Sequence, residues 1–233
     1  MRIRGTVAVV TGASSGLGRA IAVSLAKRGA DVALVARRSD LLQELCQEIE
    51  GMGGRALVMS VDVSDPAKVR DAAGEIRTEL GVPDILVNAA GFAVWKPFTE
   101  ISDAEHAAMM DVNYWGAFHW IRCVLPEMRA RGSGHIVNIS AGTGKIGLAV
   151  TSGFSASKFA LTGFSEALHR ELLGTGVRVS CVHPGSIRTD FWDEEAIPKR
   201  GLPPLVRFSP KMSAKAVARD IVFFCIRLGS PSR

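Results

Sequence analysis

The residues Val7–Gly18, VAVVTGASSGLG, join an apolar, β-branched run to a glycine-rich turn that opens directly into a helical pattern. β-branched residues favour strands, and glycines let the backbone turn tightly and approach a charged group closely. The free N–H groups at a helix N-terminus attract anions such as phosphate. The stretch therefore predicts a strand, a phosphate-binding turn and a helix in immediate succession. Its glycine spacing is GxxxGxG rather than the GxGxxG of the general dinucleotide fingerprint.

The same alternation of strand and helix continues along the chain. Further apolar runs lie at 32–35, 56–61, 85–87, 136–139 and 177–182, and helical stretches lie at 17–29, 40–51, 66–80, 103–130, 155–174 and 213–227. Near-continuous apolar strands are typical of a parallel sheet that is covered on both faces. We therefore expect an α/β fold, a Rossmann-type doubly wound parallel sheet of six or seven strands, with ligands at the carboxyl ends of the strands.

Composition and charge favour one domain that binds a small molecule. The 233 residues are 47% hydrophobic, and no Pro-, Gly- or Ser-rich linker divides them, so residues 1–233 are expected to form a single domain. The net charge of +5 comes from scattered basic residues, of which the densest groups are the pairs Arg37-Arg38 and Lys199-Arg200. Such pairs suit a phosphate-bearing small molecule better than a nucleic-acid groove, which needs a continuous basic stripe.

The cysteines and the N-terminus give no sign of secretion or of metal binding. Cys46, Cys123, Cys181 and Cys225 are far apart and have no histidine at metal-ligand spacing, so neither a disulfide framework nor a metal site is expected. The N-terminus has no signal-peptide pattern, and no apolar run approaches the roughly 20 residues that a membrane span needs. The expected setting is cytoplasmic, with no membrane or nucleic-acid partner.

The motif TGASSGLG resembles the TGxxxGxG motif of the short-chain dehydrogenase/reductase family, and the resemblance extends over nearly the whole chain. The turn NAAG at 88–91 resembles that family's NNAG, with Ala89 replacing the second asparagine. The resemblance implies a nicotinamide-dependent oxidoreductase that acts on the carbonyl/alcohol pair of a small molecule. It implies cofactor contacts from Gly12, Ser14, Ser15, Gly16, Leu17, Gly18, Arg37, Arg38, Asp62, Val63, Asn88, Ala89, Ala90, Gly91, Lys158, Pro184, Gly185, Ile187 and Thr189.

The end of the second predicted strand indicates which dinucleotide is bound. An acid at this position would hydrogen-bond the ribose 2′-hydroxyl and repel a 2′-phosphate. The chain has Ala36 there, followed by Arg37 and Arg38. A guanidinium presents a fork of donors that matches phosphate oxygens. We therefore expect NADP(H) to be the cofactor.

The resemblance also assigns catalytic positions, one of which has lost its reactive group. Ser140 matches the serine that orients the carbonyl, Lys158 the lysine that holds the ribose, and Asn113 the asparagine of a proton relay. The family's tyrosine, which passes the proton, belongs four residues before the lysine, and this chain has Phe154 there. Hydride transfer to a carbonyl leaves an alkoxide that needs a positioned acid. Tyr114, the only tyrosine, is expected to point about 100° away from Asn113 on a regular helix.

Three interpretations of Phe154 remain open at this stage. The phenylalanine is a substitution or variant that impairs an otherwise ordinary carbonyl reductase, as the retained Ser140, Lys158 and Asn113 would indicate. Alternatively, the protein reduces an acceptor that needs no tyrosine acid, such as a C=N or an activated C=C bond, or it lets water protonate the product. In the third interpretation it is a catalytically silent protein that binds NADP(H).

The segment 186–212 lacks clean periodicity and is expected to form a substrate lid, because a loop this long in a compact domain is usually functional. Aromatic residues such as Trp95, Phe191 and Trp192 indicate a largely apolar substrate. The helices at 103–130 and 155–174 resemble those through which family members pair, so a homodimer or homotetramer is expected. Family members usually add a seventh strand after the last helix, and both a truncated chain and a six-stranded sheet remain possible.

Overall fold

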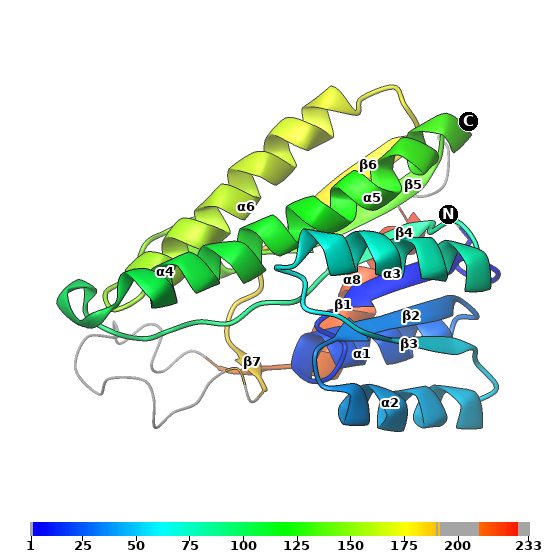
Figure 1. Ribbon diagram of the computed structural model, residues 1–233, viewed down its shortest axis with the longest axis horizontal. Helices are drawn as coiled ribbons and strands as arrows, with labels where there is room; N and C mark the ends of the chain where they lie inside the picture. The colour runs from blue at the N-terminus through cyan, green and yellow to red at the C-terminus, as the bar shows by residue number, and fades with distance from the viewer. Residues whose placement is uncertain (1, 190, 192–209, 228–233) are drawn as a thin grey trace.

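The computed structural model describes residues 2–189, 191 and 210–227 (Figure 1). Its centre is a six-stranded parallel sheet in the order β3-β2-β1-β4-β5-β6. The strands are β1 (Val7–Thr11), β2 (Asp31–Ala36), β3 (Ala56–Ser60), β4 (Ile85–Asn88), β5 (Gly134–Ile139) and β6 (Val177–Val182). Each strand coincides with one of the predicted apolar runs, and the predicted parallel α/β fold is confirmed. Residues 228–233, which follow the last helix, lie outside the described residues.

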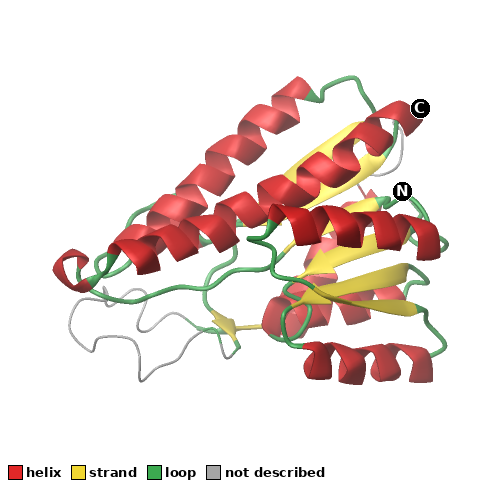
Figure 2. Cartoon of the chain, in the orientation of Figure 1, coloured by secondary structure: helices red, strands yellow, loops and turns green. Residues whose placement is uncertain are grey.

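Helices cover both faces of the sheet, as Figure 2 shows. One apolar core joins the sheet to α1 (Gly16–Ala26), α2 (Ser39–Gly51) and α8 (Ala214–Arg227). A second core joins the opposite face to α3 (Pro66–Glu79), α5 (Gly116–Arg131) and α6 (Ser152–Glu171). None of the helices in the described part of the chain has the length and apolarity needed to cross a bilayer.

The order of the strands reverses at β1, which opens a crevice at its carboxyl end. Within the sheet, Val9 of β1 pairs with Ala33 of β2 on one side and with Leu86 of β4 on the other. The crossovers that leave β1 and β4 therefore run to opposite sides, and a crevice forms where they diverge. The glycine-rich turn begins at this point, directly after Thr11.

The predicted helix at 103–130 is not one regular helix. It consists of α4 (Asp103–Met110), a π-helical turn η2 (Asp111–Trp115) and then α5. A π-turn adds one residue to the hydrogen-bonded ring and is only five residues long here, so the periodicity of the sequence did not reveal it. Such turns are frequent at functional sites, and this one contains Asn113.

The ends of the predicted lid carry a short two-stranded parallel sheet. The strand β7 (Ile187–Arg188) pairs with β8 (Met212–Ser213), and Met212 donates its backbone N–H to the carbonyl oxygen of Ser186. The segment 186–212 is therefore closed at its base rather than structureless throughout. Residues 190 and 192–209, which include Trp192, lie outside the described residues.

Candidate active site

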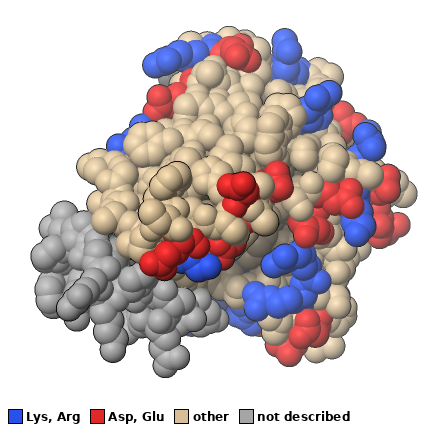
Figure 3. Space-filling view, turned by 60° about the vertical axis from the view of Figure 1, so that its left-hand side comes forward, with Lys and Arg blue, Asp and Glu red and all other residues tan. Residues whose placement is uncertain are grey.

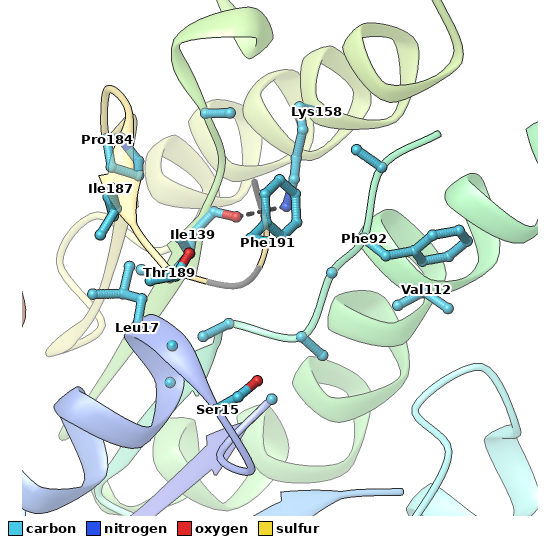
Figure 4. A pocket seen from close by; sticks show the side chains of 18 of the residues that line it. Ser15, Leu17, Phe92, Val112, Ile139, Lys158, Pro184, Ile187, Thr189 and Phe191 are labelled. Atoms are coloured by element: carbon cyan, nitrogen blue, oxygen red, sulfur yellow. Dashed lines mark hydrogen bonds between the residues drawn. The ribbon is translucent and has the colours of Figure 1, made fainter. Parts of the chain in front are cut away.

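A cavity of about 720 Å³ opens at the carboxyl ends of the central strands. It is lined by the glycine-rich turn, the ends of β2 to β5, the start of α6 and the segment that follows β6. In the close view of Figure 4, Ser15 and Leu17 lie at one end of it, and Lys158 and Phe191 lie toward the other. All the site residues predicted from the sequence line this cavity except Asn88 and Asn113, which lie behind its wall.

The glycine-rich turn is locked to the turn that follows β4. Gly12 has φ of +67°, and a Cβ there would lie 2.8 Å from the carbonyl oxygen of Ala89 and from the amide nitrogen of Ala90. The Thr11 hydroxyl accepts hydrogen bonds from the same two residues, at 3.0 Å from the Ala89 nitrogen and 3.1 Å from the Ala90 nitrogen. Only a glycine fits at position 12, because both the backbone conformation and the space exclude a side chain.

The two arginines after β2 have different partners. Arg38 reaches across the crevice, and its Nη2 lies 3.0 Å from Ser14 Oγ and 2.8 Å from Ser15 Oγ. Arg37, which is exposed like Arg38, has its Nη1 3.9 Å from Asp62 Oδ2. Burial alone would raise the pKa of Asp62, but hydrogen bonds from Ser64 and the charge of Arg37 outweigh it and lower that pKa. Arg38 is therefore the guanidinium that is held in place beside the glycine-rich turn.

Lys158 and Asn113 meet at the turn after β4, where Gly91 has no room for a side chain. A Cβ at Gly91 would lie 2.8 Å from Asn113 Oδ1 and 3.3 Å from Lys158 Nζ. The Asn113 amide bonds both backbone groups of Phe92 at 3.0 Å, and its Nδ2 also donates to Ser157 Oγ at 2.9 Å. The π-turn thus places Asn113 where it braces the cavity wall from behind.

The lysine is fully enclosed and is directed along the cavity wall. Lys158 Nζ donates a hydrogen bond to the carbonyl oxygen of Ile139 at 2.9 Å, which Figure 4 shows as a dashed line. Burial lowers the pKa of Lys158 to about 8. The site therefore holds a cation that loses its proton much more readily than an ordinary lysine.

Ser140 has partners other than the expected ones. Its hydroxyl donates to the backbone carbonyl of Lys158 at 3.1 Å and lies 2.9 Å from Thr162 Oγ1, so it is engaged with α6. The next residue, Ala141, has extended backbone angles, and it packs against the group of apolar side chains around Phe154. Side chains alternate along an extended segment, so the residue that faces this group is the alanine and not the serine.

Phe154 lies in an apolar chamber at the inner end of the cavity. Its side chain is 3% exposed and packs with Trp95 and Met109. The ring centroids of Trp95 and Phe191 each lie 5.7 Å from that of Phe154. Lys158 Nζ lies 5.8 Å from the centroid of the Phe154 ring. An apolar surface therefore occupies the position at which the family resemblance places a proton donor.

The side chains of Tyr114 and His183, which could also donate a proton, have partners outside the cavity. Tyr114, on η2, packs edge-on against Phe164 of α6, with ring centroids 5.8 Å apart, in an aromatic group on η2, α5 and α6. His183 Nε2 lies 3.1 Å from Thr162 Oγ1, and burial together with the nearby charge of Lys145 lowers the pKa of this histidine. Neither residue lines the cavity.

Sequence reasoning missed Thr11, Ala141 and Thr143. The structure assigns Thr11 to the contact between the two turns, while Ala141 and Thr143 line the cavity. Thr11 carried a signal, because it is the first residue of the glycine motif. Ala141 and Thr143 lie between Ser140 and Phe154 in the chain, and nothing in the sequence distinguished them from their neighbours.

Related sequences indicate the family of the chain. Residues 6–199 match the family model described as short chain dehydrogenase. The ketoacyl reductase HetN of Nostoc sp. is 36% identical over 220 residues, which are 94% of this chain and 76% of that protein. The glycine betaine reductase ATRR of Emericella nidulans is 40% identical over 205 residues, which are 86% of this chain but only 16% of that much longer protein.

Solved structures show the same architecture. A metagenomic short-chain oxidoreductase in complex with NADP superposes with a TM-score of 0.83 at 31% identity, over 97% of this chain and 93% of that one. An alcohol dehydrogenase from the archaeon Thermococcus sibiricus, complexed with 5-hydroxy-NADP, superposes with a TM-score of 0.84 at 25% identity, over 95% and 90% of the two chains. With the family match over most of its length, this chain belongs to the short-chain dehydrogenase/reductase family of oxidoreductases.

Proposed function

We propose that this protein is an NADP(H)-dependent oxidoreductase that acts on a small, largely apolar molecule whose hydride acceptor needs no proton from the side chain at position 154. The observation that carries the proposal is the apolar chamber. Phe154 and Ala141 form its surface, while the Ser140 hydroxyl is bonded to α6. The chamber therefore lacks a hydroxyl at two positions, 141 and 154. A single introduced substitution in an ordinary carbonyl reductase would have removed only one.

The residues of the cavity fit a phosphorylated dinucleotide. The cavity volume of about 720 Å³ lies within the range of cofactor sites. The close approach at Gly12 leaves room for a pyrophosphate at the N-terminus of α1, and the Ser14, Ser15 and Arg38 group would hold a 2′-phosphate. Lys158, Pro184 and Gly185 line the part of the cavity where the nicotinamide end would lie. When bound, NADPH supplies the hydride.

The chemistry of the acceptor follows from the missing acid. A simple ketone becomes an alkoxide on reduction. Without a positioned proton donor, this reduction is slowed roughly 10²–10⁴-fold. A C=N bond that is already cationic needs no proton at that step, and an activated C=C bond spreads the charge that it gains. An apolar chamber therefore selects against simple ketones more than against these acceptors. The carbonyl/alcohol pair remains the reaction expected from the family resemblance, at low rate.

This proposal is tested by NADPH consumption with a ketone, a cyclic imine and a conjugated enone of similar size. We expect the imine or the enone to oxidise NADPH at least about 10²-fold faster than the ketone, because only the ketone needs the missing acid. The measurement is the loss of NADPH absorbance, with cofactor binding followed separately by fluorescence. Binding of NADPH without consumption by any acceptor would identify a silent binding protein instead, and a ketone reduced as fast as the others would contradict the role given to the chamber.

We also propose that two copies of the chain pair through an aromatic surface on η2, α5 and α6. Its members are Tyr114, Trp115, Phe118, His119 and Phe164, whose rings contact one another. The Trp115 side chain is 41% exposed. Figure 3, which brings the α4 end of the molecule forward, shows a broad area without charged side chains. An exposed tryptophan among half-buried aromatic rings is typical of a protein interface.

Replacing Trp115 is expected to weaken that pairing. Trp115→Glu removes a large aromatic side chain from the centre of the aromatic group and places a charge there, so the dimer dissociation constant should rise roughly 10–100-fold, as it does when a central aromatic anchor is lost. Light scattering after gel filtration over a range of concentrations measures the change. Phe98→Glu, at an aromatic residue on η1 (Phe98–Glu100) that is 76% exposed and outside this group, is the matched control. A Trp115→Glu protein that stays dimeric at low concentration would place the interface elsewhere.

A further inference from the structure

The Thr162 hydroxyl on α6 is the centre of a buried set of hydrogen bonds. Its Oγ1 atom donates to the carbonyl oxygen of Lys158 at 2.8 Å, and it lies 2.9 Å from Ser140 Oγ and 3.1 Å from His183 Nε2. A hydroxyl has one proton to donate and two lone pairs that accept. With Ser140 and His183 as donors, the Thr162 hydroxyl uses its full hydrogen-bonding capacity. Thr162 is 6% exposed, so water hardly competes for these bonds.

The Ser140 hydroxyl is enclosed by the same group of atoms. It can give its proton to Thr162 Oγ1 or to the carbonyl oxygen of Lys158, 3.1 Å away, and both acceptors belong to α6. Gly144 packs closely against it, because a Cβ at this glycine would collide with Ser140 Oγ. In the opposite direction, Lys158 Nζ donates to the carbonyl oxygen of Ile139, the residue before Ser140 (Figure 4). The end of β5 is therefore attached to α6 through two consecutive residues.

His183 holds the Thr162 hydroxyl from the side of β6. It directly follows this strand and is half-buried. The ends of β5 and β6 are paired at Ile139 and Val182, and Ser140 donates its backbone N–H to the carbonyl oxygen of Val182 at 2.8 Å. Thr162 thus meets one residue from the end of each strand, Ser140 after β5 and His183 after β6. A hydrogen-bonded group that is anchored on three elements has little freedom to turn its hydroxyls elsewhere.

We propose that Thr162 is a positioning residue that sets the acceptor specificity, because it keeps the Ser140 hydroxyl on α6 and so withholds it from the carbonyl oxygen of a ketone. The proposal rests on the function proposed above and assigns a cause to its preference for acceptors other than simple ketones. Ser140 matches the serine that orients the carbonyl in the family resemblance, yet it is Ala141 that packs in the chamber. Thr162 does not line the cavity, so it acts only through Ser140.

Loss of the Thr162 hydroxyl would release the side chain of Ser140 but not its backbone. The N–H bond to Val182 keeps the residue in place, and only the rotation about its Cα–Cβ bond changes. Ser140 lines the cavity, so the rotated hydroxyl can reach a ketone there. Hydride from NADPH then forms a C–H bond at the carbonyl carbon, the C=O π pair moves to the oxygen, and water supplies the proton that completes the alcohol. The rotated hydroxyl stabilises the negative charge on that oxygen, whereas an iminium ion develops no such charge.

Thr162→Val tests this assignment with acetophenone as the ketone and 3,4-dihydroisoquinoline as the cyclic imine. We expect kcat for acetophenone to rise about 10-fold with KM nearly unchanged, because the hydrogen bond that is lost is worth roughly a factor of ten. The rate with the imine should stay within about two-fold, because its reduction needs no donor to an oxygen. Thr162→Ser keeps the hydroxyl and should behave as the present chain does. Thr78→Val is the matched control, since the exposed Thr78 hydroxyl bonds the carbonyl oxygen of Gly74 in the same manner on α3.

A partial release gives a graded test that leaves α6 intact. His183→Leu removes one of the three partners of the Thr162 hydroxyl at a half-buried position, so kcat for acetophenone should rise by roughly 2- to 3-fold, less than in Thr162→Val. The affinity for NADPH, followed by fluorescence, should stay the same in every variant. A ketone rate that rises in neither variant would show that Thr162 does not restrain Ser140.

The carbonyl stretch of acetophenone bound to the protein with NADP⁺ reports on the Ser140 hydroxyl without turnover. A hydrogen bond to the carbonyl oxygen lowers the frequency of this vibration. The frequency should fall in Thr162→Val, fall less in His183→Leu, and keep its value in an apolar solvent in the present chain and in Thr162→Ser.

Equal frequencies in Thr162→Val and the present chain would overturn the proposal, and so would a present chain that does not bind acetophenone. An equal gain in rate with the ketone and the imine would also overturn it. Should the frequency fall as expected while the present chain consumes no NADPH with any acceptor, the role of Thr162 stands and the proposed oxidoreductase function falls.

Discussion

Phe154→Tyr is expected to create ketone-dependent oxidation of NADPH, with a gain of roughly 10²–10⁴-fold over the present chain. The change adds a phenolic hydroxyl to a ring whose centroid lies 5.8 Å from Lys158 Nζ. A nearby cation lowers the pKa of a phenol, so the new hydroxyl would give up its proton more readily. The two side chains have nearly the same shape, so the chamber should accept the hydroxyl with little strain. Steady-state assays with a small ketone measure the gain, and the affinity for NADPH should stay the same.

The structure also indicates why the single change should reach only the lower part of that range. The Ser140 hydroxyl is bonded to α6, and Ala141 offers no second donor beside Phe154. Adding Ala141→Ser to Phe154→Tyr should raise the ketone rate further, because one additional donor to the developing oxyanion is worth about 10²–10³-fold. Phe159→Tyr, at a residue of the same helix that is 45% exposed, is the matched control and should change nothing. An unchanged ketone rate in the double variant would show that the missing hydroxyls do not limit ketone reduction.

Arg38→Ala is expected to raise the dissociation constant of NADPH roughly 10- to 100-fold and to leave that of NADH nearly unchanged. A charged hydrogen bond to the 2′-phosphate is worth about 1.5–3 kcal/mol, and each 1.4 kcal/mol corresponds to a factor of ten. Arg38 is held for this contact by Ser14 and Ser15, so little further ordering is needed on binding. Fluorescence titration of both cofactors against the two proteins measures the difference.

Arg37→Ala provides the comparison within the same pair. The Arg37 side chain is 74% exposed and lies 3.9 Å from Asp62, so its charge is screened by solvent and partly offset by a carboxylate. Its removal should weaken NADPH binding only a few-fold. Equal losses in the two variants would contradict the assignment of the 2′-phosphate to Arg38, and the absence of any loss in either would remove the argument for NADPH over NADH.

The sequence by itself determined the fold and predicted which residues gather at the carboxyl ends of the central strands. Continuous apolar strands, helices with one apolar face and the glycine turn after β1 are local patterns, and the rules of parallel sheets then place the strand ends side by side. Residues that are far apart in the chain, such as Ser14, Arg38, Asp62 and Ala90, were therefore predicted to meet, and they all line one cavity. The phenylalanine at position 154 was also evident from the sequence, because its spacing from Lys158 is set by a single helix.

Tertiary structure alone decided which hydroxyls face the chamber. The strand β5 ends at Ile139, and α6 packs beside it, so the Ser140 side chain finds its partners on a helix 18 residues further along the chain, and Ala141 faces Phe154. The π-turn that carries Asn113, the position of Arg38 across the crevice and the hydrogen bonds of Thr162 likewise depend on neighbours that are distant in sequence. A local pattern reports which face of an element is apolar. It does not report which polar side-chain atoms will form hydrogen bonds, because their partners are brought close only when the elements pack against one another.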